Sequence, residues 1–298
     1  MISTEPNLVL VGVNHKATPV EIREKLAFNQ VKLEASLEQL VSCPEIAENI
    51  ILSTCNRVEI YARVDDIDQG IKLLKDFICD YHGISRGSLD QYFYSYTDNQ
   101  AVEHLFRVSA SLDSMILGEA QILGQVKDAY STARASSSTG LVLNQLFEKA
   151  FNVAKKVREE TGISERGVSI SSAAVELAKK IFEDLENHSV MLVGTGEMAE
   201  LAAKHLISYG VKTVYVASRT YERAVSLAQT LNGCALGFDA FKEELYRADI
   251  VITSTAAPNF IVSKEMIEQA IHKRKNKPIF LIDIAVPRDI APEVNDLE

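Results

Sequence analysis

The residues with the clearest chemical potential lie in the stretch 50–61, where two apolar segments flank the run Ser-Thr-Cys-Asn-Arg. This pattern predicts a strand, a tight turn and a second strand, with Asn56 as a typical turn residue. The Cys55 thiol would then lie at the mouth of the turn, two residues before the Arg57 guanidinium. A nearby cation lowers the pKa of a thiol, and the thiolate is the nucleophilic form. A lone cysteine is more often a small buried hydrophobe, so these residues alone leave both interpretations open.

A glycine-rich turn in the second half of the chain is the other stretch with chemical potential. It follows the apolar run 189–193, precedes a predicted helix over 197–209, and reads Gly194-Thr195-Gly196-Glu197-Met198-Ala199. In this strand-turn-helix context the pattern Gly-x-Gly-x-x-Ala predicts a dinucleotide site. The glycines let the backbone approach a pyrophosphate, and the helix N-terminus supplies positive potential.

The end of the next predicted strand, 213–217, indicates which dinucleotide is favoured. A site for NAD places an acidic residue there, to bind the ribose 2′-hydroxyl. This chain instead has Ser218-Arg219-Thr220, and an arginine with two hydroxyls suits a 2′-phosphate. We therefore expect NADPH rather than NADH as the cofactor.

Hydrophobic periodicity predicts the elements that must position the thiol. Strands are expected on both sides of Cys55, and Thr18 is expected to cap the first helix. The other elements expected before residue 99 are a strand over 8–14, helices from Pro19 to about Phe28, over 32–42 and over 66–81, and a strand over 92–96. The order β-α-β-β-α-β, with one extra short helix, is typical of a ferredoxin-like unit.

The stretch 99–160 has helical character and is expected to form a small bundle beside the sheet. Gln121 and Gln125 are four residues apart and share one helical face. The expected helices cover 101–108, 128–135 and 141–160. Several basic residues gather toward the end of this region: Lys149, Lys155, Lys156, Arg158 and Arg166. They could bind the phosphates of a nucleic acid, or they could simply form a solvated face.

The fold class expected for the whole chain is α/β. Residues 1–161 would form an α+β, ferredoxin-like catalytic domain with added helices, which recognises the substrate. Residues 162–298 would form a Rossmann domain with a doubly wound parallel sheet, entered through a helix over 168–185. Further strands over 249–253 and 279–284 continue the alternation of this second domain.

Composition excludes several classes of protein. The net charge of −10 argues against a general nucleic-acid binder with a basic surface. The four cysteines show neither a CxxC spacing nor a paired histidine pattern, so we expect neither a metal site nor a disulfide framework. We find no apolar stretch that could span a membrane and no signal peptide, and free thiols favour a cytoplasmic setting.

Three blocks together resemble one family, glutamyl-tRNA reductase. They are residues 53–61, residues 111–125 with the run Gly-Glu-Ala-Gln, and the turn at Gly194. Ala120 stands where many members of the family have proline. Family members continue into a C-terminal helical domain that dimerises the enzyme, which this sequence lacks, so we expect a truncated chain whose dimerisation is in doubt.

The resemblance implies a two-step reduction of glutamyl-tRNA(Glu), the first step of five-carbon tetrapyrrole (porphyrin, haem) biosynthesis. Cys55 would attack the ester carbonyl, release the tRNA and carry a glutamyl thioester. NADPH in the second domain would reduce the thioester to glutamate-1-semialdehyde, after a hinge between the domains has brought thiol and cofactor together. The aldehyde could then pass to glutamate-1-semialdehyde aminomutase.

The resemblance also implies roles for individual residues. Arg57 would bind the substrate's side-chain carboxylate, with a brace for the turn as the alternative. His104 would orient the ester or assist proton transfer, with a structural hydrogen bond as the alternative. Glu119 could hold the α-ammonium group. The full set of positions that match the family's substrate pocket is Thr54, Asn56, Arg57, Ser114, Glu119, Ala120, Gln121 and Gln125.

Two other functions stay open at this point. An acylating aldehyde dehydrogenase would use a small acyl donor, although enzymes of the glyceraldehyde-phosphate type carry their thiol after the nucleotide domain and Cys55 precedes it. A non-catalytic sensor would bind NADPH and tRNA without needing Cys55.

Overall fold

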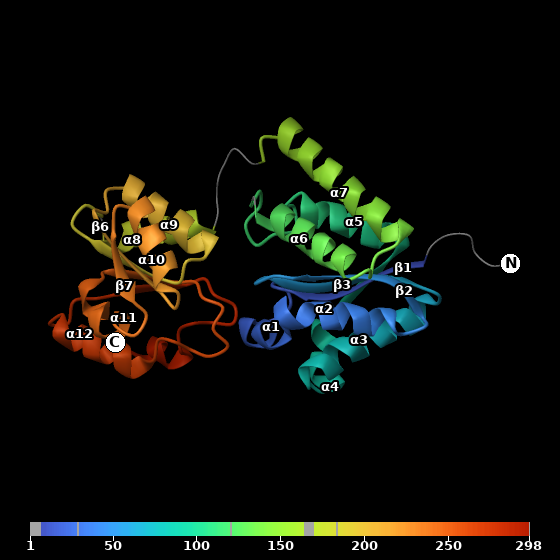
Figure 1. Cartoon of the computed structure of the whole chain (residues 1–298), viewed down its shortest axis with the longest axis horizontal. Coiled ribbons are helices and arrows are strands. Elements are labelled where there is room, and N and C mark those ends of the chain that lie inside the picture. The colour runs from blue at the N-terminus through green and yellow to red at the C-terminus, as the bar shows by residue number, and fades with distance from the viewer. Residues whose placement is uncertain (1–6, 29, 120, 164–169, 183, 298) are drawn as a thin grey trace. The chain divides into compact units, whose positions relative to one another are not determined.

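A computed structural model describes residues 7–28, 30–119, 121–163, 170–182 and 184–297. Its internal contacts divide the chain into two units, Met1–Gly167 and Val168–Glu298. Figure 1 shows both units, each with a sheet and helices of its own. Within the described ranges, no helix has both the length and the apolar character needed to cross a membrane.

The first unit is built on an antiparallel sheet of four strands in the order β2-β3-β1-β4. Strand β1 pairs with β3 and with β4, and β3 also pairs with β2, so β3 lies between β1 and β2. This order confirms the predicted ferredoxin-like unit. The strands are β1 (Asn7–Asn14), β2 (Ile46–Ser53), β3 (Arg57–Val64) and β4 (Tyr94–Thr97).

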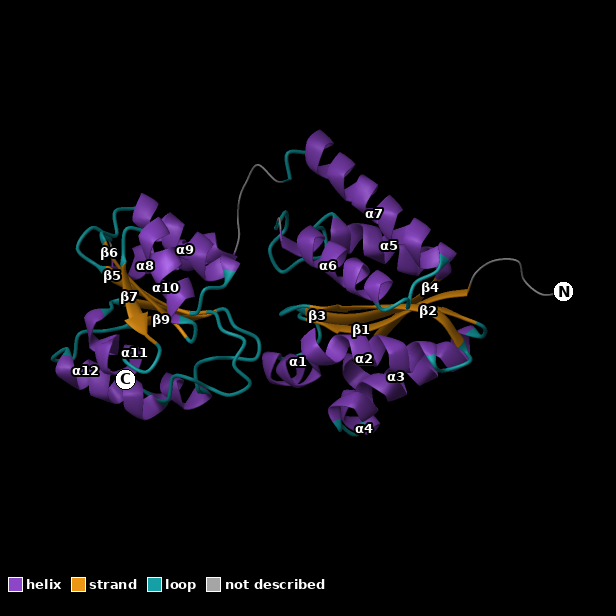
Figure 2. Ribbon diagram, in the orientation of Figure 1, coloured by secondary structure: helices purple, strands orange, loops and turns teal. Residues whose placement is uncertain are grey.

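Helices cover both faces of this sheet, as Figure 2 shows. One face carries α1 (Val20–Leu26), α2 (Gln30–Val41), α3 (Ile67–His82) and the short α4 (Arg86–Leu89). The other carries α5 (Asp98–Ser109), α6 (Gln121–Ala135) and α7 (Leu141–Glu160). Because both faces are covered, β1, β2 and β3 are buried along nearly their whole length, and Leu10, Ile50 and Ile60 are fully buried.

Two local predictions for this unit need correction. Pro19, not Thr18, is the N-cap of α1, and its carbonyl accepts from the N–H groups of Ile22 and Arg23. Thr18 therefore stands one residue too early to cap, and its buried hydroxyl has no hydrogen-bond partner among the described residues. The helix also ends at Leu26. The aromatic strand begins at Tyr94 because residues 90–92 form a 3₁₀ turn.

The second unit is a parallel sheet of five strands in the order β7-β6-β5-β8-β9, which confirms the doubly wound prediction. Alternate residues of β5 belong to two separate cores: Val190 and Leu192 to one, Met191 and Val193 to the other. The strands are β5 (Ser189–Val193), β6 (Thr213–Ser218), β7 (Cys234–Gly237), β8 (Ile250–Thr253) and β9 (Phe280–Asp283). The strand β7 was not predicted, because four residues are too few to show a periodic pattern.

Helices again cover both faces of the second sheet (Figure 2). The helix predicted over 168–185 is observed as α8 (Ile170–Phe182), and residues 168 and 169 lie outside the described ones. With α8, the helices α9 (Glu197–Ser208) and α10 (Tyr221–Thr230) pack on one face. The short α11 (Phe241–Glu244) and α12 (Lys264–Lys273) pack on the other.

Candidate active site

The turn between β2 and β3 presents Cys55, as predicted. The Thr54 hydroxyl accepts from the N–H groups of Asn56 at 3.2 Å and Arg57 at 3.1 Å. The Thr54 N–H donates to the carbonyl of Arg57 at 2.8 Å. Thr54 therefore closes the turn, and Cys55 lies at its tip, partly exposed rather than sealed in the interior.

Arg23 of α1 holds this turn from the side. Its guanidinium donates to the carbonyl oxygen of Cys55 and, at 3.2 Å, to the side-chain oxygen of Asn56. Sequence reasoning missed Arg23, because it lies 32 residues before Cys55 and carries no motif of its own. Its role as a clamp arises only from the packing of α1 beside the turn.

A small, narrow cavity of about 10 Å³ lies at the Cys55 turn. Seven of the residues that line it were predicted as site residues, and the eighth is Ile122. The seven are Thr54, Cys55, Asn56, Arg57, Ser114, Glu119 and Gln125. The tertiary fold thus brings residues 54–57 together with a segment some sixty positions further along the chain.

Two of the predicted residues do not line this cavity, and one lies outside the described residues. Gln121 begins α6, but of the two glutamines only Gln125 reaches the cavity. His104 lies on α5 and contacts other groups, described below. Ala120 lies outside the described residues.

The loop between α5 and α6 carries Ser114 and Glu119 and is fixed on both sides. The Ser111 hydroxyl donates to the Glu119 carbonyl at 2.5 Å, and Arg158 of α7 donates to the same carbonyl at 3.3 Å. Gly118 has φ +83°, and a Cβ there would come within 2.2 Å of the Ile163 carbonyl oxygen. Only glycine fits this position, which explains the Gly-Glu pair in the sequence block.

The electrostatics of the thiol correct the expectation that a cation activates it. Burial and the Glu119 carboxylate raise the pKa of the Cys55 thiol above its ordinary value. The guanidinium groups of Arg23 and Arg57 act in the opposite direction but do not outweigh these effects. Without substrate, Cys55 is therefore a neutral thiol, and substrate binding must lower the pKa of this thiol before a thiolate can form.

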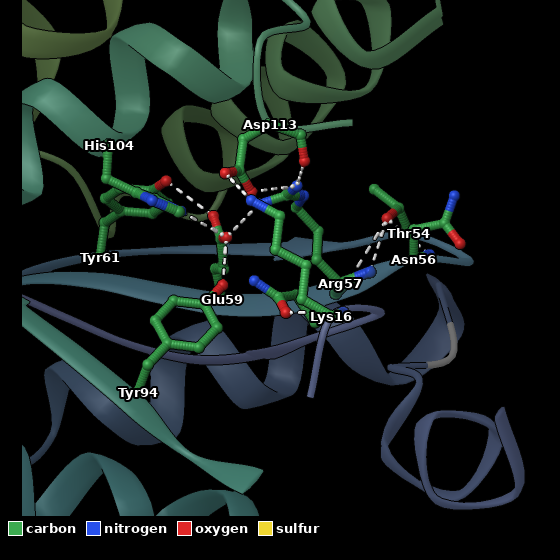
Figure 3. A network of polar contacts seen from close by, with 10 residues as sticks. Lys16, Thr54, Asn56, Arg57, Glu59, Tyr61, Tyr94, His104 and Asp113 are labelled. Atoms are coloured by element: carbon green, nitrogen blue, oxygen red, sulfur yellow. Dashed lines mark hydrogen bonds and ion pairs between the residues drawn. The ribbon is translucent and has the colours of Figure 1, made fainter. Parts of the chain in front are cut away.

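Arg57 itself is committed to a buried network (Figure 3). It is 1% exposed, and its terminal nitrogens donate to Glu59 at 2.6 Å and to Asp113 at 3.1 Å. The Asp113 carboxylate also pairs with Lys16. These contacts support the alternative given for Arg57: it braces the turn, and its donors face the protein rather than a substrate carboxylate.

Glu59 is the centre of that network. Period-two alternation on β3 puts Arg57, Glu59 and Tyr61 on one face of the sheet. The fully buried Glu59 carboxylate accepts from Arg57, from the Tyr61 hydroxyl at 2.7 Å and from the Tyr94 hydroxyl at 2.5 Å. His104 Nε2 lies 2.8 Å from the same carboxylate.

Burial alone would raise the pKa of Glu59. The charge of Arg57 and the hydrogen bond from His104 outweigh burial and hold this pKa well below its ordinary value. Gly12 makes the arrangement possible, because it pairs with both Glu59 and Tyr94 across the sheet. A Cβ at Gly12 would come within 2.8 Å of the Glu59 side chain.

His104 belongs to this network and not to the lining of the Cys55 cavity. Its ring centroid lies 5.6 Å from that of Tyr94 and 5.0 Å from that of Tyr96. The geometry therefore favours the structural alternative for His104. Glu59, Tyr94, Asp113 and Lys16 carried no predicted role, and only Glu59 and Asp113 belong to the resembling blocks.

The predicted basic cluster near the end of α7 is not a row of free cations. Lys155 and Lys156 lie 3.7 Å and 3.8 Å from Glu159 and Glu160. Arg158 reaches back to the loop that carries Glu119. Arg166 lies outside the described residues. These contacts favour the alternative of a solvated face over a phosphate-binding one.

In the second unit, a cavity of about 390 Å³ lies at the carboxyl ends of β5, β6 and β8, where the strand order reverses. This switch point is the position at which open α/β sheets bind ligands. The residues that line it include the predicted Gly194, Thr195, Gly196, Ser218, Arg219 and Thr220, together with Arg223, Phe238, Ser254, Thr255 and Ala256.

The glycine-rich turn fits a dinucleotide. Gly194 has φ +105°, and a Cβ there would lie 2.1 Å from the Ser254 carbonyl oxygen. A Cβ on Gly196 would lie 2.4 Å from the Ser254 hydroxyl. The two glycines therefore keep open the backbone cradle that a pyrophosphate needs.

Met198 and Ala199 are not among the described residues that line this cavity. Ala199 is fully buried, as expected of a small residue that lets the helix pack closely on the sheet. Met198 lies beside it in the first turn of α9, and the side chain of Glu197 lies outside the described residues.

The loop on the opposite side of this cavity is held by two carboxylates, the fully buried Asp289 and the half-buried Asp283. Asp289 accepts from the N–H of Thr255 at 2.8 Å and from its hydroxyl. Asp283 accepts from the N–H of Asp289 at 2.9 Å. Burial raises the pKa of Asp289 to about 6. These contacts fix Thr255 beside the glycine-rich turn.

Comparisons with known proteins match each unit to a family model. Residues 11–161 match the family model described as "Glutamyl-tRNAGlu reductase, N-terminal domain". Residues 176–298 match the model "Shikimate / quinate 5-dehydrogenase". The second unit therefore belongs with nicotinamide-dinucleotide dehydrogenases, as the cavity suggests.

Curated relatives and a solved structure cover nearly the whole chain. A glutamyl-tRNA reductase of Geotalea uraniireducens is 53% identical over 98% of this chain and 67% of its own length. One of Geobacter sulfurreducens is 51% identical with the same coverage. The structure of glutamyl-tRNA reductase from Methanopyrus kandleri is 40% identical, with a TM-score of 0.53 over 98% of this chain and 69% of that one.

Proposed function

This chain belongs to the glutamyl-tRNA reductase family, and we propose that Cys55 is the nucleophile that takes the glutamyl group from glutamyl-tRNA(Glu). The observation that carries the proposal is the cavity in which the Cys55 thiol meets seven further residues of the resembling blocks. The product is glutamate-1-semialdehyde, the aldehyde that opens the five-carbon route to tetrapyrroles.

The first step is acyl transfer to the thiol. Cys55 Sγ attacks the ester carbonyl, an S–C bond forms, and the C–O bond to the tRNA ribose breaks. The tRNA leaves as its free hydroxyl, which takes up the thiol proton, and a glutamyl thioester remains on Cys55. Covalent catalysis of this kind divides one difficult step into two easier ones. A thioester is also a better hydride acceptor than an oxygen ester.

The substrate itself can activate the thiol. The Glu119 carboxylate faces the same cavity, and its charge contributes to the raised pKa of Cys55. When the α-ammonium group of the glutamyl moiety pairs with Glu119, that contribution is neutralised. The pKa of Cys55 then falls as the ester arrives, so the thiolate forms only when there is a carbonyl to attack.

The second step is reduction of the thioester. The second unit binds a nicotinamide dinucleotide, which when bound in its reduced form supplies the hydride. Gly194 and Gly196 would admit its pyrophosphate, and Thr255, fixed by Asp289, borders the same cavity. After hydride reaches the thioester carbon, the C–S bond breaks, the aldehyde forms, and the Cys55 thiolate takes a proton from solvent to restore the thiol for the next turnover.

Mass spectrometry after mixing the full chain with charged tRNA, without any dinucleotide, tests the nucleophile. We expect one glutamyl adduct, on the peptide that contains Cys55. Uncharged tRNA is the control and should give none. An adduct on Cys43, Cys79 or Cys234 instead would refute the assignment.

We propose NADPH as the specific cofactor. The cavity presents Ser218, Arg219 and Thr220 at the end of β6, and no acidic residue is among its described lining residues. Arg219 is exposed there, available to a 2′-phosphate.

Replacing Arg219 by methionine should lower the preference for NADPH over NADH by roughly tenfold or more, the usual size of a lost charge-assisted hydrogen bond. Titration of each reduced dinucleotide, followed by its own fluorescence, measures the preference. Arg247→Met is the matched control, because Arg247 pairs with Glu244 away from the cavity. Tighter binding of NADH than NADPH by the unaltered chain would overturn the cofactor proposal.

Three further proposals rest on the resemblance or on the cysteines. The aldehyde would pass to glutamate-1-semialdehyde aminomutase, and the family's homodimer would be the functional assembly. The four free cysteines favour a reducing, cytoplasmic setting.

A further inference from the structure

A second cavity adjoins the one at Cys55, and none of the roles described above uses it. We propose that it binds the 3′-terminal adenosine of the tRNA substrate. The proposal rests on the function proposed for Cys55, because it assigns the leaving part of the same substrate. Its lining residues are Phe28, Leu33, Ile51, Ser53, Gln125, Asp128, Ala129 and Thr132.

The two cavities adjoin each other at two places, at Gln125 on α6 and at the end of β2. Gln125 lines both of them. On β2, Ser53 lines the second cavity, and the next two residues, Thr54 and Cys55, line the first. Two residues of extended chain span at most about 7 Å. In an aminoacyl-tRNA only one ribose separates the ester carbonyl from the terminal adenine. A carbonyl at Cys55 therefore brings the base to this second cavity.

The size and apolar lining of the cavity suit a nucleobase. Its volume is about 260 Å³, just below the range of about 300–1,000 Å³ that encloses whole small ligands, which leaves room for a single base. Phe28, Leu33, Ile51 and Ala129 supply apolar contact for the faces of a base. The Phe28 ring is backed by Tyr81, with centroids 4.7 Å apart, so it forms a firm wall.

The polar lining favours the adenosine over a phosphate. Asp128 contributes a carboxylate, and no lysine or arginine is among the described residues that line the cavity. A carboxylate repels phosphate but accepts hydrogen bonds from a group such as the exocyclic amine of adenine. The hydroxyls of Ser53 and Thr132 and the amide of Gln125 can serve the ribose and the remaining base edge. The Ser53 oxygen already accepts from the Phe28 N–H at 3.0 Å, which leaves its own hydrogen to donate.

Two minimal substrates with the same leaving group test the proposal. The full chain is mixed, without dinucleotide, with glutamate esterified through its α-carboxyl to the ribose of adenosine or of uridine. Acylation of Cys55 is followed by mass spectrometry at ester concentrations below saturation. Because both leaving groups are ribose hydroxyls, a rate difference reports on the base. We expect the adenosine ester to react roughly tenfold faster or more, the scale of one well-placed base contact.

Substitutions then locate the base. Asp128→Ala should bring the ratio of the two rates toward one. Thr132→Val, on the same helix, provides a second variant should the first fold poorly. Asp80→Ala is the matched control, because Asp80 is an exposed carboxylate on α3 outside the cavity, and it should keep the ratio of the unaltered chain.

The outcomes separate the two proposals. Equal rates for both esters in the unaltered chain, or a ratio that neither Asp128→Ala nor Thr132→Val changes, would overturn the adenosine site and leave the role of Cys55 intact. If neither ester nor charged tRNA acylates Cys55, the proposed nucleophile fails and the adenosine site fails with it.

Discussion

Replacing Cys55 by serine should reduce tRNA-dependent formation of the aldehyde by roughly three orders of magnitude or more, the scale seen when an enzyme loses its nucleophile. Serine has nearly the same shape, so the turn that Thr54 closes and Arg23 clamps should survive the change. Its hydroxyl, however, is far less acidic than a thiol. Any acyl-enzyme that did form would be an oxygen ester, which accepts hydride poorly. The measurement is a single-turnover reaction with charged tRNA and NADPH, with the aldehyde quantified.

Two other cysteines provide matched controls. Cys43 lies at the end of α2 in the same unit, and Cys234 is exposed on β7 in the second unit. Serine at either position should leave the aldehyde yield close to that of the unaltered chain. If Cys55→Ser retained the full yield, the thioester mechanism would be wrong, and the chain would act as a binding protein or through another group.

Replacing Glu59 by alanine should destabilise the first unit by about 3–5 kcal/mol, the usual cost of removing one partner from a buried ion pair. The Arg57 guanidinium would stay buried without its closest counter-charge, with Asp113 as the remaining carboxylate. Tyr61, Tyr94 and His104 would also lose their shared acceptor. Because Arg57 begins the strand after the Cys55 turn, the loss of stability should also loosen this turn.

Hydrogen exchange, resolved by segment, measures this effect in a chain of two units. Protection in β1, β3 and β4 should fall, whereas protection in β5 and β6 of the second unit should not change. Glu103→Ala is the control, because Glu103 is an exposed carboxylate on α5. Equal protection in the Glu59 and Glu103 variants would contradict the central role given to Glu59.

Acid provides an independent check on Glu59. Its pKa in the folded protein lies below the ordinary value of 4.5, so the unfolded chain takes up this proton more readily. Glu59 therefore contributes stability above pH 4.5, and that contribution is lost as the pH falls below this value. A Glu59→Gln variant has no such proton to bind, so its stability should fall less steeply over the same range.

Local signals explain which parts of the fold could be predicted. Strands β1, β2, β3, β5 and β6 and helix α7 follow continuous or periodic apolar runs, which depend on nearby residues alone. The glycines at 194 and 196 mark a turn whose geometry the backbone itself requires. The cap of α1 and the strand β7 were missed, because a proline can serve either as cap or as first helical residue, and a strand of four residues is too short to show a periodic pattern.

The sequence by itself determined that a thiol stands at a strand-turn-strand junction and that a dinucleotide turn follows in a second domain. Only the tertiary structure decided the charge state of that thiol and the partners of Arg57. The pKa of Cys55 depends on burial and on Glu119, and Arg57 meets Asp113 across 56 positions of sequence. Burial and Coulomb interactions depend on distance in space, and no spacing along the chain records which carboxylate packs against which guanidinium.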